Sequence, residues 1–341
     1  MAESMRAAVL RRFGEPLALE EVPVPAPSRG EVLVRIHASG VCHTDLHTAD
    51  GEWPVKPATP LILGHEGAGV VAAVGREVRE LKEGDRVGIA WLHDACGKCE
   101  HCVGGWESLC AAQRDSGYTL DGTFAEYALG SAAYVARLPE EVDFAAIAPI
   151  LCAGLTTYKG IRETEARPGE WLAVSGIGGL GHLAVQFGRA MGLQVAALDV
   201  AEEKLALARE LGAELTLDAK APDVVRQLMR ATGGGAHGVL VTAAAPVAFA
   251  QALRLARRRG TVTMLGLPAG SFATPILEVV LKRLTLRGSI VGTRQDLAEA
   301  LRFAAAGTVR ARIETAPLSE INRLLAALRD GAVRGRAVVT M

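Results

Sequence analysis

Four cysteines lie close together in the sequence, with a spacing that suits a bound metal ion. The run Cys96-Gly-Lys-Cys99-Glu-His-Cys102 is followed eight residues later by Cys110. Such a loop can turn four thiolates towards one centre, and a tetrahedral Zn²⁺ with four sulfur ligands keeps no position open for a substrate. An iron–sulfur cluster is the alternative, although the proline that follows the fourth cysteine in bacterial ferredoxins is absent here. The spacing therefore predicts a structural zinc site.

Two further segments and the last cysteine carry side chains that could bind a second metal ion. The segment Gly40-Val-Cys42-His-Thr44-Asp45-Leu-His47 gathers a thiol, two imidazoles, a hydroxyl and a carboxylate. The segment Gly64-His65-Glu66-Gly67 sets a histidine and a glutamate between glycines, and Cys152 stands alone. A catalytic zinc needs three protein ligands and one open position, and two Cys with one His form such a set. The ligands can come from distant segments, so spacing alone leaves open whether Cys42 and Cys152 are ligands or ordinary buried thiols.

A glycine-rich segment indicates a dinucleotide cofactor. The sequence Gly176-Ile177-Gly178-Gly179-Leu180-Gly181 follows a predicted strand and opens a predicted helix. The glycines of such a turn allow a tight bend and the close approach of a pyrophosphate, which meets the N–H groups of the helix. Asp199 lies 23 residues after Gly176, at the end of the next predicted strand. Its carboxylate can accept hydrogen bonds from a ribose 2′-hydroxyl and would repel a 2′-phosphate, which favours NAD over NADP.

The secondary structure that must position these residues changes in kind along the chain. Up to about residue 150, short alternating strands such as 31–37 and 68–74 are separated by turn residues and prolines, which predicts an all-β domain with long loops. From about residue 168, strands alternate with helices, which predicts a parallel sheet with right-handed crossovers. The expected strands are 171–175, 194–198, 238–242, 261–265 and 336–341, and the expected helices are 183–191, 201–211, 248–259 and 296–305. A length of 341 residues exceeds the usual size of a single core, so we expect two domains.

Composition narrows the classes of function. A formal net charge of −1 argues against a nucleic-acid partner held by electrostatics, and the four-cysteine loop carries one lysine against two glutamates, unlike a nucleic-acid-binding zinc ribbon. The uncharged apolar run 144–158 is too short to span a membrane, and the N-terminus lacks a signal-peptide core. We therefore expect a cytoplasmic protein with reduced thiols and no membrane partner, in which residues 1–4 are a short extension.

In this order, the three groups of residues resemble the zinc-dependent alcohol dehydrogenases of the medium-chain dehydrogenase/reductase superfamily. The resemblance covers nearly the whole chain, and Trp53-Pro-Val and Trp91-Leu are similar to the bacterial, usually tetrameric, NAD-dependent members. It implies an α/β fold of two domains. A GroES-like β-barrel catalytic domain would comprise 1–154 and 292–341, with a structural zinc lobe over 92–114, and a Rossmann NAD-binding domain with a doubly wound parallel sheet would comprise 155–291. The most specific stretches are 40–47, 64–71, 84–87, 96–110, 152–158, 176–181 and 288–294.

The resemblance implies roles for the candidate metal ligands. Cys42, His65 and Cys152 would bind the catalytic zinc, a ligand set for which this family is the standard example. Glu66 is similar to a carboxylate that can replace water on the metal, and Asp45 to the residue that orients His65. The structural zinc would be bound by Cys96, Cys99, Cys102 and Cys110. Two Zn²⁺ ions per chain and NAD are therefore the implied cofactors.

The resemblance also implies a proton relay and cofactor contacts. Thr44 and His47 match the relay that carries the alcohol proton to the surface, while zinc lowers the pKa of the alcohol and hydride passes to NAD. Other members carry arginine where this chain has His43, so we expect a missing cofactor-phosphate contact and weaker NADH binding. Arg336 resembles an arginine that binds the pyrophosphate. The other implied cofactor contacts are Thr156, Gly176, Ile177, Gly178, Gly179, Leu180, Gly181, Asp199, Lys204, Leu265, Gly266, Leu267, Ile290 and Val291.

The choice of substrate is less constrained. Trp53 and Trp91 are expected to form walls of the substrate pocket and to favour small primary alcohols, unless they only pack beneath the loops. An aromatic or secondary alcohol is the alternative substrate, and a zinc- and NAD-binding regulatory or structural homologue without turnover is the alternative function. A zinc-independent quinone or enoyl reductase would lack the cysteine sites. The expected partners are an alcohol or aldehyde and further copies of the chain, a tetramer being favoured over a dimer.

Overall fold

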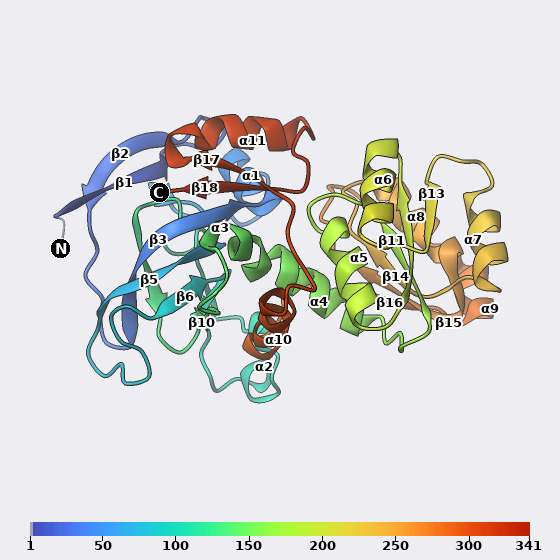
Figure 1. Cartoon of the computed structure of the whole chain (residues 1–341), viewed down its shortest axis with the longest axis horizontal. Coiled ribbons are helices and arrows are strands. Elements are labelled where there is room, and N and C mark those ends of the chain that lie inside the picture. The colour runs from blue at the N-terminus through green and yellow to red at the C-terminus, as the bar shows by residue number, and fades with distance from the viewer. Residues whose placement is uncertain (1–2) are drawn as a thin grey trace. The chain divides into compact units, whose positions relative to one another are not determined.

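The computed structural model describes residues 3–341, which form two compact units (Figure 1). The first unit contains the chain up to Cys152 together with Thr293–Ala305 and Ala311–Met341, and the second contains Ala153–Gly292 and Ala306–Arg310. Residues 153, 154, 292 and 306–310 were expected in the first domain. They group with the second unit because residue 153 begins a helix that continues in that unit, and because Arg310 exchanges two 2.9 Å hydrogen bonds with Gln186.

Antiparallel sheets dominate the first unit, as the sequence predicts for the region before residue 150. Its largest sheet has the order β10-β6-β5-β3-β18-β17, with β9 also paired to β3. These strands are β3 (Glu31–Val41), β5 (Gly67–Val74), β6 (Arg86–Ile89), β9 (Tyr127–Ser131), β10 (Ala136–Arg137), β17 (Ile313–Pro317) and β18 (Arg336–Thr340). The smaller sheets are β2-β1-β4, from β1 (Ser4–Leu10), β2 (Ala18–Pro23) and β4 (Leu61–Ile62), and β7-β8, from β7 (Leu92–Asp94) and β8 (Arg114–Asp115).

Short helices connect and cover these strands. Helix α1 begins directly after β3, and α11 packs against it, so that their apolar residues join those of β1 and β18 in one buried cluster. The helices of the first unit are α1 (His43–Asp50), α2 (Glu100–Val103), α3 (Phe144–Ile147), α10 (Arg294–Ala305) and α11 (Ile321–Arg329), with the 3-10 turns η1 (Glu107–Leu109), η2 (Ala148–Leu151) and η3 (Leu318–Glu320).

The second unit is a six-stranded parallel sheet in the order β13-β12-β11-β14-β15-β16. Its central strands are buried on both faces, which explains their nearly uninterrupted apolar sequence. The strands are β11 (Trp171–Ser175), β12 (Gln194–Asp199), β13 (Leu215–Asp218), β14 (Ala236–Val241), β15 (Ala256–Met264) and β16 (Thr285–Gly288). The helices are α4 (Ala153–Glu163), α5 (Gly181–Ala190), α6 (Glu202–Glu210), α7 (Val224–Thr232), α8 (Pro246–Leu255) and α9 (Ile276–Lys282).

One predicted helix is shorter than expected. The helix predicted over 248–259 ends at Leu255, because the next residue already pairs with Ala236 of β14 and starts β15. Arg257 then reaches a neighbouring side chain of the sheet, with Nη1 2.6 Å from Nε2 of His237. The run of arginines at 257–259 carries no apolar period, so the sequence alone did not reveal the transition from helix to strand. Within 3–341 no single helix meets the length and hydropathy of a membrane span, although the bent pair Phe144–Leu151 and Ala153–Glu163 meets them jointly.

Candidate active site and metal centres

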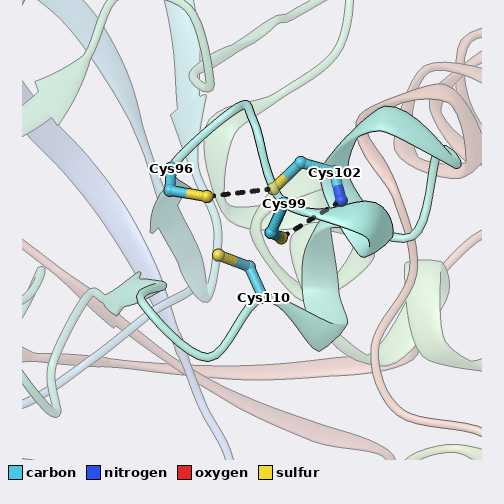
Figure 2. A group of neighbouring side chains, drawn as sticks. All are labelled: Cys96, Cys99, Cys102 and Cys110. Atoms are coloured by element: carbon cyan, nitrogen blue, oxygen red, sulfur yellow. Dashed lines mark hydrogen bonds between the residues drawn. The ribbon is translucent and has the colours of Figure 1, made fainter.

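The four clustered cysteines converge in the loop between β7 and β8 (Figure 2). Cys99 caps the start of α2, and its sulfur accepts the backbone N–H of Cys102 at 3.5 Å. The sulfurs of Cys96 and Cys102 are 4.0 Å apart, and the ligand atoms of all four residues, the last of which is Cys110, lie within 4.8 Å of one another. The short helix and the turn η1 therefore bring four separated thiols to one point.

This arrangement fits a single ion rather than a cluster. Zn–S bonds of about 2.3 Å in a tetrahedron separate the sulfurs by about 3.8 Å, close to the distance between Cys96 and Cys102. Sulfurs this close leave no room for several iron atoms, each with its own cysteine. Hydrogen bonds from the backbone N–H groups of Lys98 and Cys99 lower the pKa of Cys96 to about 6, whereas burial and the Cys99 thiol raise the pKa of Cys102 to about 12. The Cys102 thiol therefore needs a nearby cation in order to ionise at neutral pH, and zinc would supply that charge.

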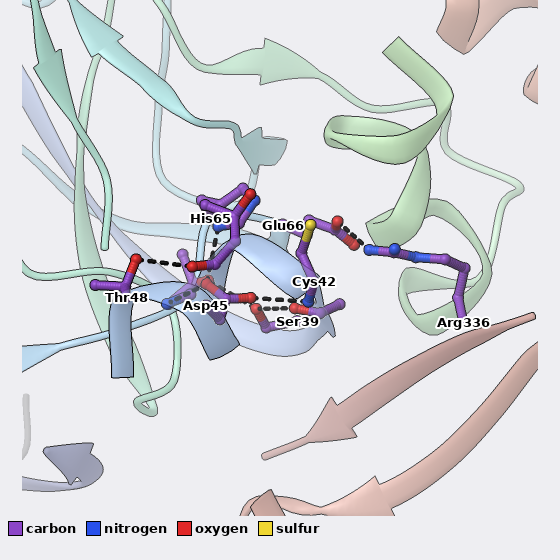
Figure 3. Close-up of polar contacts among 11 residues, drawn as sticks. Ser39, Cys42, Asp45, Thr48, His65, Glu66 and Arg336 are labelled. Carbon is purple, nitrogen blue, oxygen red and sulfur yellow. Dashed lines mark hydrogen bonds and ion pairs between the residues drawn. The ribbon is translucent and has the colours of Figure 1, made fainter. Parts of the chain in front are cut away.

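A second group of potential ligands is fully buried in the first unit (Figure 3). It comprises Cys42 at the start of α1, His65 and Glu66 just before β5, and Cys152 after η2, with their ligand atoms within 4.8 Å of one another. The antiparallel pairing of β3 with β5 brings the first two segments to the same end of the sheet, where the N–H of Gly40 donates to the carbonyl of Glu66 at 3.1 Å. Glycine is required at position 40, because a Cβ there would lie 1.8 Å from the Glu66 carboxylate.

Asp45 joins the two segments that carry these residues. Its Oδ1 accepts the Nδ1–H of His65 at 2.9 Å and the backbone N–H of Gly64 at 3.2 Å, and its Oδ2 accepts the N–H of Cys42 at 2.8 Å. Burial alone would lower the pKa of His65, but the Asp45 carboxylate and the Cys42 sulfur together outweigh it and raise that pKa well above the ordinary value. With Nδ1 held as the donor, the Nε2 lone pair of His65 is available for a metal.

Buried polar atoms without protein partners indicate what this group can bind. Nε2 of His65 and Oε2 of Glu66 are both buried and unpaired within the described chain. The Cys152 thiol donates to Cys42, which holds the pKa of Cys42 well below its ordinary range and raises the pKa of Cys152. Two sulfurs and one imidazole nitrogen form a soft donor set that suits Zn²⁺. The residues therefore fit a zinc ion held by Cys42, His65 and Cys152.

Arg336 lies deep in the same site, on β18. Its guanidinium is 2% exposed and forms an ion pair with Oε1 of Glu66 (Figure 3). Burial raises the pKa of Glu66 to about 7, although the nearby guanidinium acts in the opposite direction. This ion pair could not be predicted from the sequence, since 270 residues separate its members. The expected contact between Arg336 and the cofactor pyrophosphate stays a prediction.

In the second unit, the glycine-rich segment forms the turn between β11 and α5. Gly176 has φ +100°, and a Cβ on Gly181 would lie 1.8 Å from the carbonyl oxygen of Gly176. Among the described residues no side chain caps the N-terminus of α5, and the N–H groups of His182 and Leu183 donate to the carbonyls of Gly178 and Leu180 at 3.1 and 3.0 Å. The Asp199 carboxylate accepts the N–H of Ile177 at 2.6 Å and those of the next two residues of its own segment at 2.8 and 3.1 Å. Three of its roughly four acceptor positions are filled, which leaves one for a hydroxyl.

Comparison with known proteins agrees with both units. The alcohol dehydrogenase GroES-like domain family matches residues 28–140, and the zinc-binding dehydrogenase family matches residues 179–306. An alcohol dehydrogenase of Rhizobium meliloti is 55% identical over 99% of both chains, and one of Moraxella is 54% identical over 98% of this chain and 99% of its own. The chain belongs to the zinc-dependent alcohol dehydrogenases. This result confirms the predicted family and the predicted enzyme class.

Solved structures confirm the predicted fold class. The alcohol dehydrogenase of Aeropyrum pernix superposes with a TM-score of 0.91 at 35% identity, covering 98% of this chain and all of that one. An acetophenone reductase from Geotrichum candidum, solved in complex with NAD, has a TM-score of 0.89 at 29% identity and covers 100% of this chain and 98% of its own. Both comparisons span the GroES-like domain and the Rossmann-like sheet together. The chain is thus a medium-chain dehydrogenase over its whole length.

The residues expected to form the proton relay of the alcohol dehydrogenase lie on α1. Thr44 is half-buried, and its carbonyl accepts the Thr48 hydroxyl at 2.7 Å. His47 lies one turn further along the helix, with Nδ1 2.5 Å from Oε2 of Glu52. Among residues 3–341 the side chains of Thr44 and His47 form no hydrogen bond with each other, so a proton passing between them needs a bridging hydroxyl or water. Glu52 did not stand out in the sequence, because it follows the helix in an ordinary polar turn.

A cluster of three aromatic side chains lies beside His65. The ring of Trp91 meets His65 edge-on with centroids 5.3 Å apart, and Trp53 lies 6.0 Å from Trp91. Tyr118 packs on both tryptophans, at 5.2 and 5.6 Å, and its hydroxyl donates to the carbonyl of Val55. The two tryptophans were predicted from the sequence as pocket residues, and the tyrosine was not. No periodic pattern marks Tyr118, which lies in the turn that follows β8.

The remaining residues with implied cofactor contacts all lie in the second unit. Thr156 is on α4 and Lys204 is on α6, and both are half-buried. Residues 265–267 follow β15, and Ile290 and Val291 follow β16, with Ile290 54% exposed. Gly178 has no atom within 4 Å of a Cβ built on it, so space is open above the turn. Residues 265–267, 290 and 291 thus follow the carboxyl ends of β15 and β16, the end of the sheet at which dinucleotides bind in such folds.

Proposed function

We propose that the enzyme interconverts small primary alcohols and aldehydes with hydride transfer to NAD, and that each chain holds two zinc ions. The observation that carries the proposal is the buried group of Cys42, His65 and Cys152. Nε2 of His65 has no partner among the described residues, and the Trp91 ring packs against this imidazole. The four-cysteine group supports the second, structural ion. A bound catalytic zinc supplies a Lewis acid that lowers the pKa of an alcohol hydroxyl.

The protein's own residues would orient the ligands and remove the proton. Asp45 fixes the ring of His65 through Nδ1, and Arg336 balances the charge of Glu66 beside the ligands. The Thr44 hydroxyl would accept the alcohol proton, and the quarter-exposed imidazole of His47 would take it to water. Surrounding aromatic rings exclude bulk water, which strengthens electrostatic interactions in the pocket.

We also propose NAD as the preferred cofactor. The Asp199 carboxylate keeps one acceptor position for a ribose hydroxyl, and its negative charge would oppose a 2′-phosphate. Solved relatives carry either cofactor, since the acetophenone reductase is described with NAD and a zinc-binding dehydrogenase of Sinorhizobium meliloti with NADP. Replacement of Asp199 by Gly is expected to raise kcat/KM with NADP relative to NAD. An unchanged ratio would remove Asp199 from cofactor selection.

Small primary alcohols are the proposed substrates because the rings of Trp53, Trp91 and Tyr118 lie within 6.0 Å of one another beside His65. Aromatic or secondary alcohols are the second candidate, favoured by the resemblance to the acetophenone reductase. NADH formation with ethanol, propan-2-ol and benzyl alcohol separates the two. We expect the highest kcat/KM with ethanol, and a higher value with benzyl alcohol would favour the second candidate. No NADH with any alcohol would indicate a homologue without turnover.

A variant pair tests the pocket itself. Trp53→Ala is expected to raise kcat/KM for benzyl alcohol relative to ethanol, because it opens one aromatic wall. Trp106→Ala is the matched control, since Trp106 is 44% exposed in the four-cysteine lobe. An equal effect of both substitutions would show that Trp53 only packs beneath its loop.

We further propose that the enzyme is a homo-oligomer, with a tetramer favoured, and that it works in the cytoplasm, where its six free thiols stay reduced. Helix α9 exposes four large apolar side chains, each between 62% and 79% accessible, next to the open edge strand β16. A second copy would cover this face. Light scattering should give a mass several times 35.7 kDa, and Leu277→Lys should reduce it. A monomeric mass would contradict the proposal.

A further inference from the structure

The turn that ends α1 carries an acidic residue back onto the helix. Gly51 adopts φ +67°, and the N–H of Glu52 then donates to the carbonyl of His47 at 3.1 Å. Gly51 also lies against the ring of Phe13, which a Cβ at that position would approach to 2.9 Å. Because any larger residue would be strained and would clash, the turn is fixed. It places the Glu52 side chain beside the last turn of the helix.

The carboxylate of Glu52 meets one face of the His47 imidazole. Its Oε2 lies 2.5 Å from Nδ1, and the two side chains are 55% and 25% exposed. A carboxylate can only accept, so Nδ1 must carry the proton, which leaves the lone pair on Nε2. In the described chain, Glu52 has no ion pair other than this one with His47.

Several other titratable side chains lie near the pair of His47 and Glu52. Asp50, the other carboxylate at this helix end, is occupied by Arg329 at 2.7 Å. The ring of His43 is 6.2 Å from that of His47, and burial lowers the pKa of His43. Arg329 lies near enough to Glu52 to interact with it through space. Among residues 3–341, only the carboxylate of Glu52 contacts the His47 ring through a hydrogen bond.

We propose that Glu52 is a positioning residue for proton transfer. It holds Nδ1–H of His47, so that Nε2 accepts the proton that the Thr44 hydroxyl passes on through a bridging hydroxyl or water, and then releases this proton to water. Each oxygen of the relay gives up one proton and gains one, and the Glu52 carboxylate only accepts the hydrogen bond of Nδ1–H. The inference rests on the proposed role of His47 in the relay.

A double-mutant cycle tests the inference in the full-length, zinc-loaded enzyme. Glu52→Ala should lower kcat for ethanol oxidation about 10-fold, the usual cost of losing a residue that orients a functional imidazole, and leave KM for NAD unchanged. Glu52→Gln should retain most of the activity, because its amide oxygen still accepts from Nδ1–H. In a His47→Ala background, Glu52→Ala should cost nothing further. Asp50→Ala is the matched control and should not change kcat.

The outcomes separate the two proposals. If His47→Ala slows the reaction and Glu52→Ala does not, the role of Glu52 is wrong while the relay stands. If Glu52→Ala lowers kcat equally with and without His47, Glu52 acts through the fold and the inference is overturned. If His47→Ala leaves kcat unchanged, the relay itself fails, and the proposed mechanism fails at that step.

Discussion

Asp45 holds two of the candidate zinc ligands in place through hydrogen bonds. Its carboxylate accepts hydrogen bonds from the His65 ring and from the backbone N–H groups of Gly64 and Cys42. The Asp45 residue is 1% exposed. Two ligand-bearing segments are thereby fixed by a single side chain. Such partners orient a metal ligand and raise its basicity.

Replacement of Asp45 by Asn is therefore expected to weaken zinc binding at the catalytic site by about 10- to 100-fold. The amide keeps one acceptor oxygen but loses the charge that supports the imidazole. Competition with a chromogenic chelator measures the affinity. Asp50→Asn is the control, because Asp50 lies on the same helix and bonds Arg329 instead. If both variants retain zinc as the wild type does, Asp45 does not support the site.

The Asp115 carboxyl group should make the free energy of unfolding depend on pH. Burial raises its pKa from 3.8 to about 6, and Oδ1 has no hydrogen-bond partner among residues 3–341. The folded state therefore binds the proton more tightly than the unfolded state, so this group's contribution is fully present below about pH 4 and is lost as the pH rises through 6. Asp115→Asn should stabilise the enzyme at about pH 8, on the order of 2 kcal/mol, and by much less at about pH 4. Thermal unfolding at both pH values measures this, and an equal effect at both would contradict it.

At the scale of elements, the two metal-binding groups differ in how far sequence could predict them. The four-cysteine site is local, since one short helix and one turn assemble it. The spacing of the cysteines was therefore sufficient to predict it. The group of Cys42, His65 and Cys152 depends on the register of β3 against β5, which a single sequence does not encode locally. This ligand group was predicted only through the resemblance to a known family. The pairs Glu66–Arg336 and Tyr118–Val55 join distant segments, so no pattern revealed them.

The turn between β11 and α5 allows an element-scale test. Gly181→Ala should destabilise the second unit and abolish NADH binding, because its Cβ would lie 1.8 Å from a carbonyl oxygen. Gly178→Ala should weaken NADH binding with little change in Tm, since only open space surrounds that position. Thermal unfolding and NADH fluorescence titration report the two effects. A wild-type Tm for Gly181→Ala would show that the turn tolerates a side chain.

At the scale of the whole molecule, each unit holds a different part of the chemistry. The first holds both metal-binding groups and the candidate relay, and the second holds the glycine-rich turn with Asp199. The sequence predicted this division and the parallel sheet from the change in strand and helix pattern. It misplaced residues 306–310, because the return from α10 to the second unit follows hydrogen bonds of Arg310 rather than a composition change.

Metal content is the most direct test of the two proposed zinc sites and of the zinc-dependent mechanism. We expect elemental analysis of the purified enzyme to find two zinc atoms per chain and no iron. Cys42→Ser should retain one zinc atom, bind NADH normally and form no NADH from ethanol, because only the catalytic ion is lost. A wild-type chain that holds one zinc atom or iron, or a Cys42→Ser variant that still oxidises ethanol, would contradict the account.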